Sequence, residues 1–161
     1  MKRSERREHI FLMLFQRDFF EQEELEEQCR NYFDNMEEVV QCLIEEKKAL
    51  GYENEGSVKK ISDKDKIKLK ERYENIIEKL SEIDKIIEEV SSGWRINRMG
   101  KVDLALLRLA VFEIYFDADI PTGVAINEAV ELAKAYGQDS SPSFVNGILA
   151  KAVKAKGTEN E

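Results

Sequence analysis

Histidine, cysteine and proline are scarce in this chain of 161 residues, which contains one histidine, two cysteines and two prolines. A hydrolase triad, a zinc site or a HExxH motif would each need more histidine or cysteine than that. Neither a GxxxxGKS/T nor a GxGxxG motif is present, so nothing predicts a nucleotide-binding loop. We therefore expect a protein that is not an enzyme and that needs neither a metal nor a cofactor.

Cysteine pairs and long uncharged segments are also missing. Cys29 and Cys42 form no CxxC motif, which indicates reduced thiols and a cytoplasmic protein. The longest stretch free of charged side chains is Ser140–Ala150, 11 residues, whereas a membrane span needs about 20. The apolar run Ile10–Phe15 follows basic residues but is too short for a signal peptide and lacks a small-residue cleavage site. We expect no membrane-spanning segment.

Glycine is infrequent as well, with 8 residues, and so few turn formers argue against a many-stranded sandwich or barrel. Hydrophobic residues make up 42% of the chain, which argues against disorder. Charged residues make up 36%, above the usual ~25%, as is typical of helices with charged outer faces. The length matches one domain of about 150 residues.

Apolar residues recur at helical spacing along most of the chain, and this pattern predicts an all-α domain of about seven helices. Ser4 is the expected N-cap of the first helix. A short second helix is predicted over Leu25–Phe33 and a third over Met36–Leu50, with Gly51 as its left-handed stop.

The second half of the chain predicts the remaining helices. Ser62 and Asp65 resemble a capping box that opens a long helix to about residue 90, with a break near Ser81. The segment Val102–Phe116 is apolar nearly all round and is predicted to be the central helix. The next helix covers about 126–136.

The last helix is expected to have Ser141 as its cap and Pro142 in its first turn. Gly137 stops the helix before it. We predict a single domain over residues 1–153 and a flexible C-terminal tail over 154–161.

Three charged residues interrupt the predicted central helix. Arg108 and Glu113 are five positions apart and do not face each other, so each is expected to pair with a residue of another helix. Asp103 is either a first-turn acid that complements the helix dipole or a residue that faces a partner.

The net charge of −8 argues against a protein that coats nucleic acid, but the charge is uneven. Residues 21–55 contain 12 acidic and 3 basic residues, whereas residues 1–9, 58–72 and 92–112 carry net charges of +2, +4 and +3. A nucleic-acid site needs only a local patch. The run 58–72 is interleaved with acids and favours a solvated face. The N-terminal cations are either a phosphate-binding arm or a solvated terminus.

Three sequence blocks carry a resemblance to a known family. RREHIFLMLFQRD (Arg6–Asp18), VDLALLRLAVFEI (Val102–Ile114) and VAINEAVELAKAYGQDSSPSFVNG (Val124–Gly147) resemble the NusB family of transcription antitermination factors in order and spacing. The resemblance implies two small helical bundles packed into one domain. It also implies an RNA-binding adaptor that binds boxA-type RNA of ribosomal RNA transcripts. Its implied partners are NusE, a small-subunit ribosomal protein, and the antitermination complex on RNA polymerase.

The resemblance also implies the site residues. The implied RNA-binding residues are Lys2, Arg3, Arg6, Arg7, Lys101 and Phe144. Phe144 would stack on an unpaired base, with a core aromatic as the alternative. Phe15 and Asp103 resemble residues of the family's NusE-facing surface.

Two other functions stay open at this point. One is a helical protein-interaction module that binds no RNA, and the other is a stand-alone relative of the RNA-binding domain of ribosomal RNA methyltransferases. The chain begins with Met1 and ends at Glu161, so we expect it to be complete and without a methyltransferase domain. The broad apolar band Ile10–Phe15 is compatible with a monomer or a homodimer.

Overall fold

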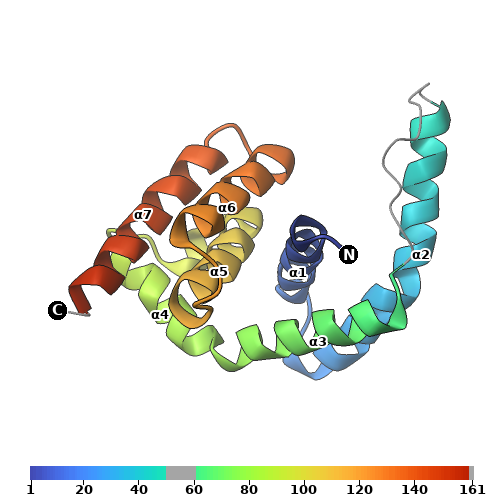
Figure 1. The fold of residues 1–161 in the computed structure, drawn as a ribbon, viewed down its shortest axis with the longest axis horizontal. Coiled ribbons are helices and arrows are strands. Elements are labelled where there is room, and N and C mark those ends of the chain that lie inside the picture. The colour runs from blue at the N-terminus through green and yellow to red at the C-terminus, as the bar shows by residue number, and fades with distance from the viewer. Residues whose placement is uncertain (50–60, 160–161) are drawn as a thin grey trace.

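The computed structural model describes residues 1–49 and 61–159, except for the side chains of Gln22, 36–44, 46–48 and 158–159. These residues form seven α-helices and two short 3-10 helices, with no strand among them (Figure 1). The helices are α1 (Arg3–Arg17), η1 (Gln22–Glu24), α2 (Leu25–Ala49), α3 (Asp63–Glu78), α4 (Leu80–Val90), η2 (Ile96–Arg98), α5 (Lys101–Phe116), α6 (Thr122–Tyr136) and α7 (Ser141–Glu159). The all-α prediction is confirmed.

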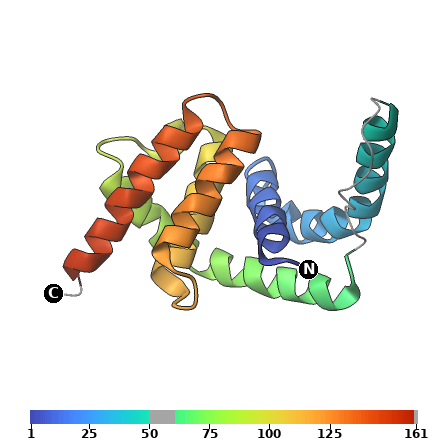
Figure 2. The ribbon, with the colours of Figure 1, turned by 45° about the horizontal axis from the view of Figure 1, so that its top comes forward.

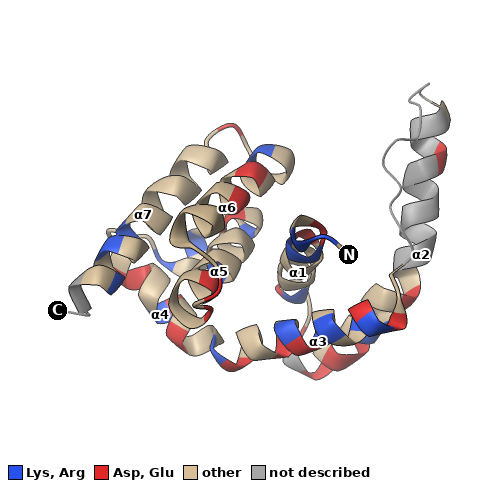
Figure 3. Cartoon of the chain, in the orientation of Figure 1, with Lys and Arg blue, Asp and Glu red and all other residues tan. Residues whose placement is uncertain are grey.

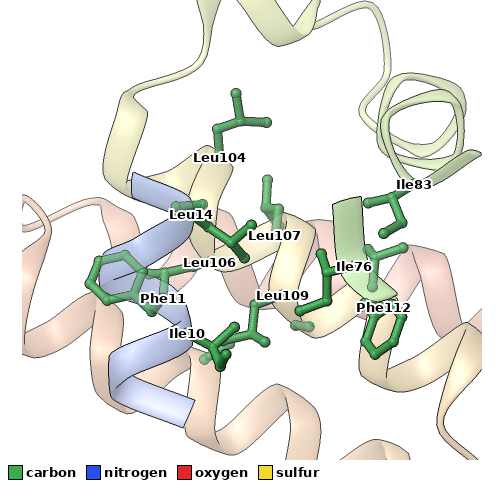
Figure 4. Packing of buried hydrophobic residues seen from close by; sticks show 14 of the residues in the cluster. Ile10, Phe11, Leu14, Ile76, Ile83, Leu104, Leu106, Leu107, Leu109 and Phe112 are labelled. Atoms are coloured by element: carbon green, nitrogen blue, oxygen red, sulfur yellow. The ribbon is translucent and has the colours of Figure 1, made fainter. Parts of the chain in front are cut away.

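Helix α5 occupies the centre of the fold, as predicted. Every residue from Leu104 to Ile114 is buried. Helices α4, α6 and α7 pack around α5 to form one bundle, and α1 packs against α5 from the other side (Figure 1). Figure 4 shows Ile10, Phe11 and Leu14 of α1 among the leucines of α5. Burial of α5 on all sides therefore explains why its sequence has no polar face.

Helices α1, α2 and α3 form the smaller part of the molecule. Helix α1 contacts both α2 and α3, and α2 extends away from the body (Figure 1). The sequence predicted separate helices over Leu25–Phe33 and Met36–Leu50, and this prediction is wrong, because α2 runs unbroken through both. Asp34 and Asn35 are weak helix formers, but no proline or glycine lies there to end the helix. The predicted stop at Gly51 lies outside the described residues.

The long helix predicted up to residue 90 is divided in two, close to the expected break at Ser81. The break lies at Lys79, whose N–H donates to the carbonyls of both Ile76 and Ile77. Helix α4 starts directly after it and turns the chain from α3 towards the α5 bundle (Figure 1). The predicted cap at Ser62 is confirmed, since its hydroxyl oxygen accepts the N–H of Asp65 at 3.1 Å.

Two other predicted caps are wrong. Helix α1 begins one residue before Ser4, because the carbonyl of Lys2 already accepts the N–H of Arg6 at 3.0 Å. In α7 the first carbonyl acceptor is Ser140, which receives the N–H of Phe144 at 3.1 Å. Ser141 is already helical, and its hydroxyl accepts the N–H of Gln138 at 3.0 Å.

Helix α7 is longer than the sequence predicted. It continues past Lys154 to Glu159, and Lys156 donates to the carbonyl of Ile114 at 2.6 Å. Gly137, the predicted stop of α6, leaves no room for a side chain, because a Cβ there would lie 2.6 Å from the side chain of Ser141. None of the helices in the described part of the chain has the length and apolar character to cross a membrane.

Candidate nucleic-acid interface

A buried ion pair holds the start of α1 on the larger bundle. Arg7 donates from Nε and Nη2 to the two carboxylate oxygens of Glu113 at 2.8 and 3.0 Å. The two side chains are only 9% and 3% exposed, and Glu128 of α6 lies 3.7 Å from Arg7. Burial alone would lower the pKa of Arg7, but the bonds and charge of Glu113 raise it above its ordinary value. Glu113 thus has the partner that the sequence predicted, and Arg7 is not a free cation.

A second buried cluster joins α1, α4 and α5. Arg108 donates from Nε and Nη2 to Asp84 at 2.9 and 3.0 Å, and from Nη1 to Asp18 at 2.9 and 3.0 Å. The prediction that Arg108 pairs with another helix is confirmed. The two clusters attach α1 to α5 near both ends of α1, so the residues of α1 have defined positions relative to the bundle.

The remaining N-terminal cations have no such partners. Lys2 and Arg3 are exposed, Arg6 is half-buried, and none of the three forms an ion pair with another described residue. The terminal amine of Met1 lies 3.8 Å from Asp65, which brings the N-terminus to the start of α3 (Figure 2). In Figure 3 basic residues stand at the start of α1, whereas acidic residues lie in the first turn of α2. The cations are therefore available to an anionic ligand.

Aromatic residues connect α1 to the junction of α6 and α7. Tyr136, at the end of α6, hydrogen-bonds to Glu8 and lies 5.2 Å from Phe11, centroid to centroid. Figures 1 and 2 both show α6 and α7 side by side, joined by the short loop 137–140. Phe144, one turn into α7, is half-buried and meets Trp94 in a T-shaped contact at 6.0 Å. Phe144 is thus neither a fully buried core residue nor fully exposed.

The residues expected to face a protein partner lie on two helices that pack together. Phe15 is half-buried between Phe11 and Phe19, with centroid distances of 6.3 and 5.1 Å. Asp103 is half-buried, and its Oδ1 has no hydrogen-bond partner in the described part of the chain. Lys101, at the first position of α5, is exposed.

The other candidate chemical groups have structural surroundings. His9 hydrogen-bonds through Nδ1 to the hydroxyl of Tyr32 at 2.8 Å, and its burial lowers its pKa. Cys29 is half-buried, and its burial raises the pKa of its thiol. Within 1–49 and 61–159, no cluster of three or more histidine, cysteine, aspartate or glutamate side chains is arranged to hold a metal.

Comparison with known proteins agrees with this arrangement. The model of the NusB family matches residues 4–154. The chain belongs to the NusB family. The transcription antitermination protein NusB of Lachnoclostridium phytofermentans is 50% identical over 153 residues, which cover 95% of this chain and 99% of that protein.

Solved NusB structures share the fold. NusB of T. maritima superimposes with a TM-score of 0.69 at 33% identity, covering 96% of this chain and 92% of that one. A chain from a structure of the antitermination factors NusB and NusE in complex with double-stranded RNA gives a TM-score of 0.63. The sequence identity is 26%, and the match covers 96% of this chain and 99% of the NusB–NusE chain.

Two features of this surface were not found from the NusB-like sequence blocks. Trp94 lies between α4 and η2, outside the three sequence blocks, although an isolated tryptophan beside glycine in a polar loop is a usable signal. The burial of Arg7 was missed because the sequence does not show which of four neighbouring cations faces Glu113.

Proposed function

We propose that this chain is a non-catalytic transcription antitermination factor that binds boxA-type RNA together with NusE. The observation that carries the proposal is the division of the N-terminal cations. Arg7 is bound by Glu113, while Lys2, Arg3 and Arg6 have no ion-pair partner among the described residues. Unpaired cations on a helix whose position is fixed are suited to phosphate groups, because little side-chain pairing has to be broken on binding.

The RNA would extend from these cations towards the α6–α7 junction. Tyr136 links α1 to the end of α6, and Phe144 follows within one turn of the next helix. An aromatic ring that is partly exposed can stack on an unpaired base, which is the usual mode of single-stranded RNA recognition. Lys101 would add a further phosphate contact from the start of α5.

NusE would bind beside Phe15 and Asp103. Both residues are half-buried, so each keeps an exposed part for a partner. Asp103 forms no ion pair with a described residue, and a carboxylate of that kind is suited to a basic group of NusE. A chain with a net charge of −8 repels RNA at long range, so a basic partner beside the RNA would raise its affinity. The complex would then act with RNA polymerase, in the cytoplasm.

The test is a titration of boxA-type RNA onto this protein, with and without NusE, at two salt concentrations. We expect NusE to increase the affinity and a scrambled RNA to bind less tightly. The logarithm of the binding constant should fall with the logarithm of salt concentration by about 0.7 per neutralised phosphate. Equal affinity for scrambled RNA together with no effect of NusE would reject the proposal in favour of an interaction module without RNA.

A further inference from the structure

The loop between α4 and η2 holds one aromatic side chain at the surface. Ser91 is 3% exposed, and its hydroxyl donates to the carbonyl of Trp94 at 2.6 Å. The N–H of Trp94 donates back to the carbonyl of Ser91 at 3.2 Å. Ser92 and Gly93, between them, have φ angles of +53° and +92°, the left-handed values that close a tight turn. The backbone of Trp94 is therefore fixed by its own loop.

Trp94 is nevertheless 53% exposed. Its only ring contact among the described residues is the T-shaped one with Phe144, with an interplanar angle of 71°. A contact of that kind covers a part of each ring and leaves the rest to solvent. Two adjacent, partly exposed aromatic rings on a fixed backbone form a preorganised apolar patch, which is typical of a binding site.

The surroundings of this patch are basic. Arg95 directly follows Trp94 and Arg98 ends η2; both are exposed and neither forms an ion pair with a described residue. Lys151 of α7 reaches the loop, with its Nζ 3.0 Å from the hydroxyl of Ser92. Two acids lie near this segment: Glu88 accepts the N–H of residue 96 at 3.5 Å, and Asp84, which is already bonded to Arg108, lines the same hollow as Arg95. Local positive charge around two partly exposed aromatic rings fits a nucleic-acid strand, whose phosphates and bases alternate, better than an apolar protein segment.

We propose that Trp94 and Phe144 form a stacking platform for an unpaired RNA base, with Arg95, Arg98 and Lys151 beside the adjoining phosphates. The proposal rests on the proposed RNA-binding function and extends it to residues of the α4–η2 loop. The RNA strand then continues past Phe144 onto this loop instead of ending at the α6–α7 junction.

The test uses two separate signals from the same titration. Trp94 is the single tryptophan of the chain, so its fluorescence reports on this loop alone. We expect boxA-type single-stranded RNA, with NusE present and its contribution subtracted, to quench Trp94 in parallel with a rise in the anisotropy of a dye on the RNA. Inorganic polyphosphate, which has charge but no bases, should compete for the cations without comparable quenching.

The variants measure the contribution of the ring. Trp94→Ala should weaken RNA binding by roughly 5- to 150-fold, as expected for the loss of one base–aromatic stack, and Trp94→Phe should retain most of the affinity. Val124→Ala is the control, because Val124 is also an exposed apolar residue but belongs to another element, the start of α6. Its affinity should be unchanged. Circular dichroism spectra that match the wild type verify folding of all three.

The outcomes separate this proposal from the previous one. If the RNA anisotropy rises while Trp94 is not quenched and Trp94→Ala binds normally, the stacking platform is wrong and the RNA-binding function stands. If no anisotropy change occurs even with NusE, the RNA-binding function itself fails. If a peptide partner quenches Trp94 and RNA does not, the patch is a protein-docking site and the proposal is overturned.

Discussion

Glu113→Gln should destabilise the fold strongly although it keeps the size of the side chain. The substitution leaves the guanidinium of Arg7 buried without its counter-charge, and removing one partner of a buried pair typically costs 3–5 kcal/mol. Glu128, which is 39% exposed, stays 3.7 Å away and compensates in part. We therefore expect a loss near the lower end of that range, about 3 kcal/mol in the free energy of unfolding.

The assay is urea denaturation followed by circular dichroism, with a double variant that removes both charges. Arg7→Met combined with Glu113→Leu should recover stability to within about 1 kcal/mol of the wild type, because no charge is left buried. The matched control is Glu131→Gln, which breaks the ion pair with Lys134. The side chains of Glu131 and Lys134 are 67% and 59% exposed. An exposed pair of this kind contributes about 0–1 kcal/mol.

The same variants test the assignment of the N-terminal cations. If Arg7 is structural, the Arg7→Met, Glu113→Leu protein should bind RNA with an unchanged salt dependence. A slope reduced by about 0.7 would instead return Arg7 to the phosphate contacts. The reasoning is refuted if Glu113→Gln costs no more than Glu131→Gln, since the Arg7–Glu113 pair would then behave as an exposed one.

Three further predictions follow from the packing and the charges. Arg3→Glu combined with Arg6→Glu should weaken RNA binding at least tenfold by gel shift and leave NusE affinity intact. Asp103→Lys should weaken NusE binding and leave RNA affinity intact. Loss of both affinities in either protein would contradict separate surfaces. Gly137→Ala should lower the free energy of unfolding by about 1–3 kcal/mol, because its Cβ would lie 2.6 Å from the next helix, and an unchanged urea midpoint would reject that clash. The pKa of His9 is lowered in the folded state, so the unfolded chain binds more protons below about pH 6.5. The free energy of unfolding should therefore fall as the pH decreases from 7.5 to 5. His9→Gln should remove part of that dependence in thermal melts, and an identical pH profile would exclude His9 as its cause.

The sequence predicts most of the helices because their apolar residues follow one period. Ser62 and Gly137 mark helix ends correctly, since capping and crowding are local effects visible within a few residues. The N-cap predicted at Ser141 lies one residue after the observed one, because serine is an acceptable N-cap at either of two adjacent positions and tertiary packing decides between them. The N-cap predicted at Ser4 lies two residues after the observed one, Lys2, which is not among the usual capping residues.

The candidate site is predicted less completely than the fold. The partners of Arg108 and Glu113 could be expected to exist but not identified, because Asp18, Asp84 and Arg7 are distant in sequence. Phe144 was found only through its family block, and its contact with a loop residue 50 positions earlier depends on how α7 packs on the bundle.

The complete enclosure of α5 restricts where this fold can place a binding residue. From Leu104 to Ile114 each side chain is committed to internal packing or to a buried ion pair, so a substitution there changes folding before it changes recognition. Ligands can reach α5 only at its termini, and both Lys101 and Asp103 lie in its first turn. Binding specificity in such a protein can diverge at the helix ends and connecting loops while the central helix stays fixed.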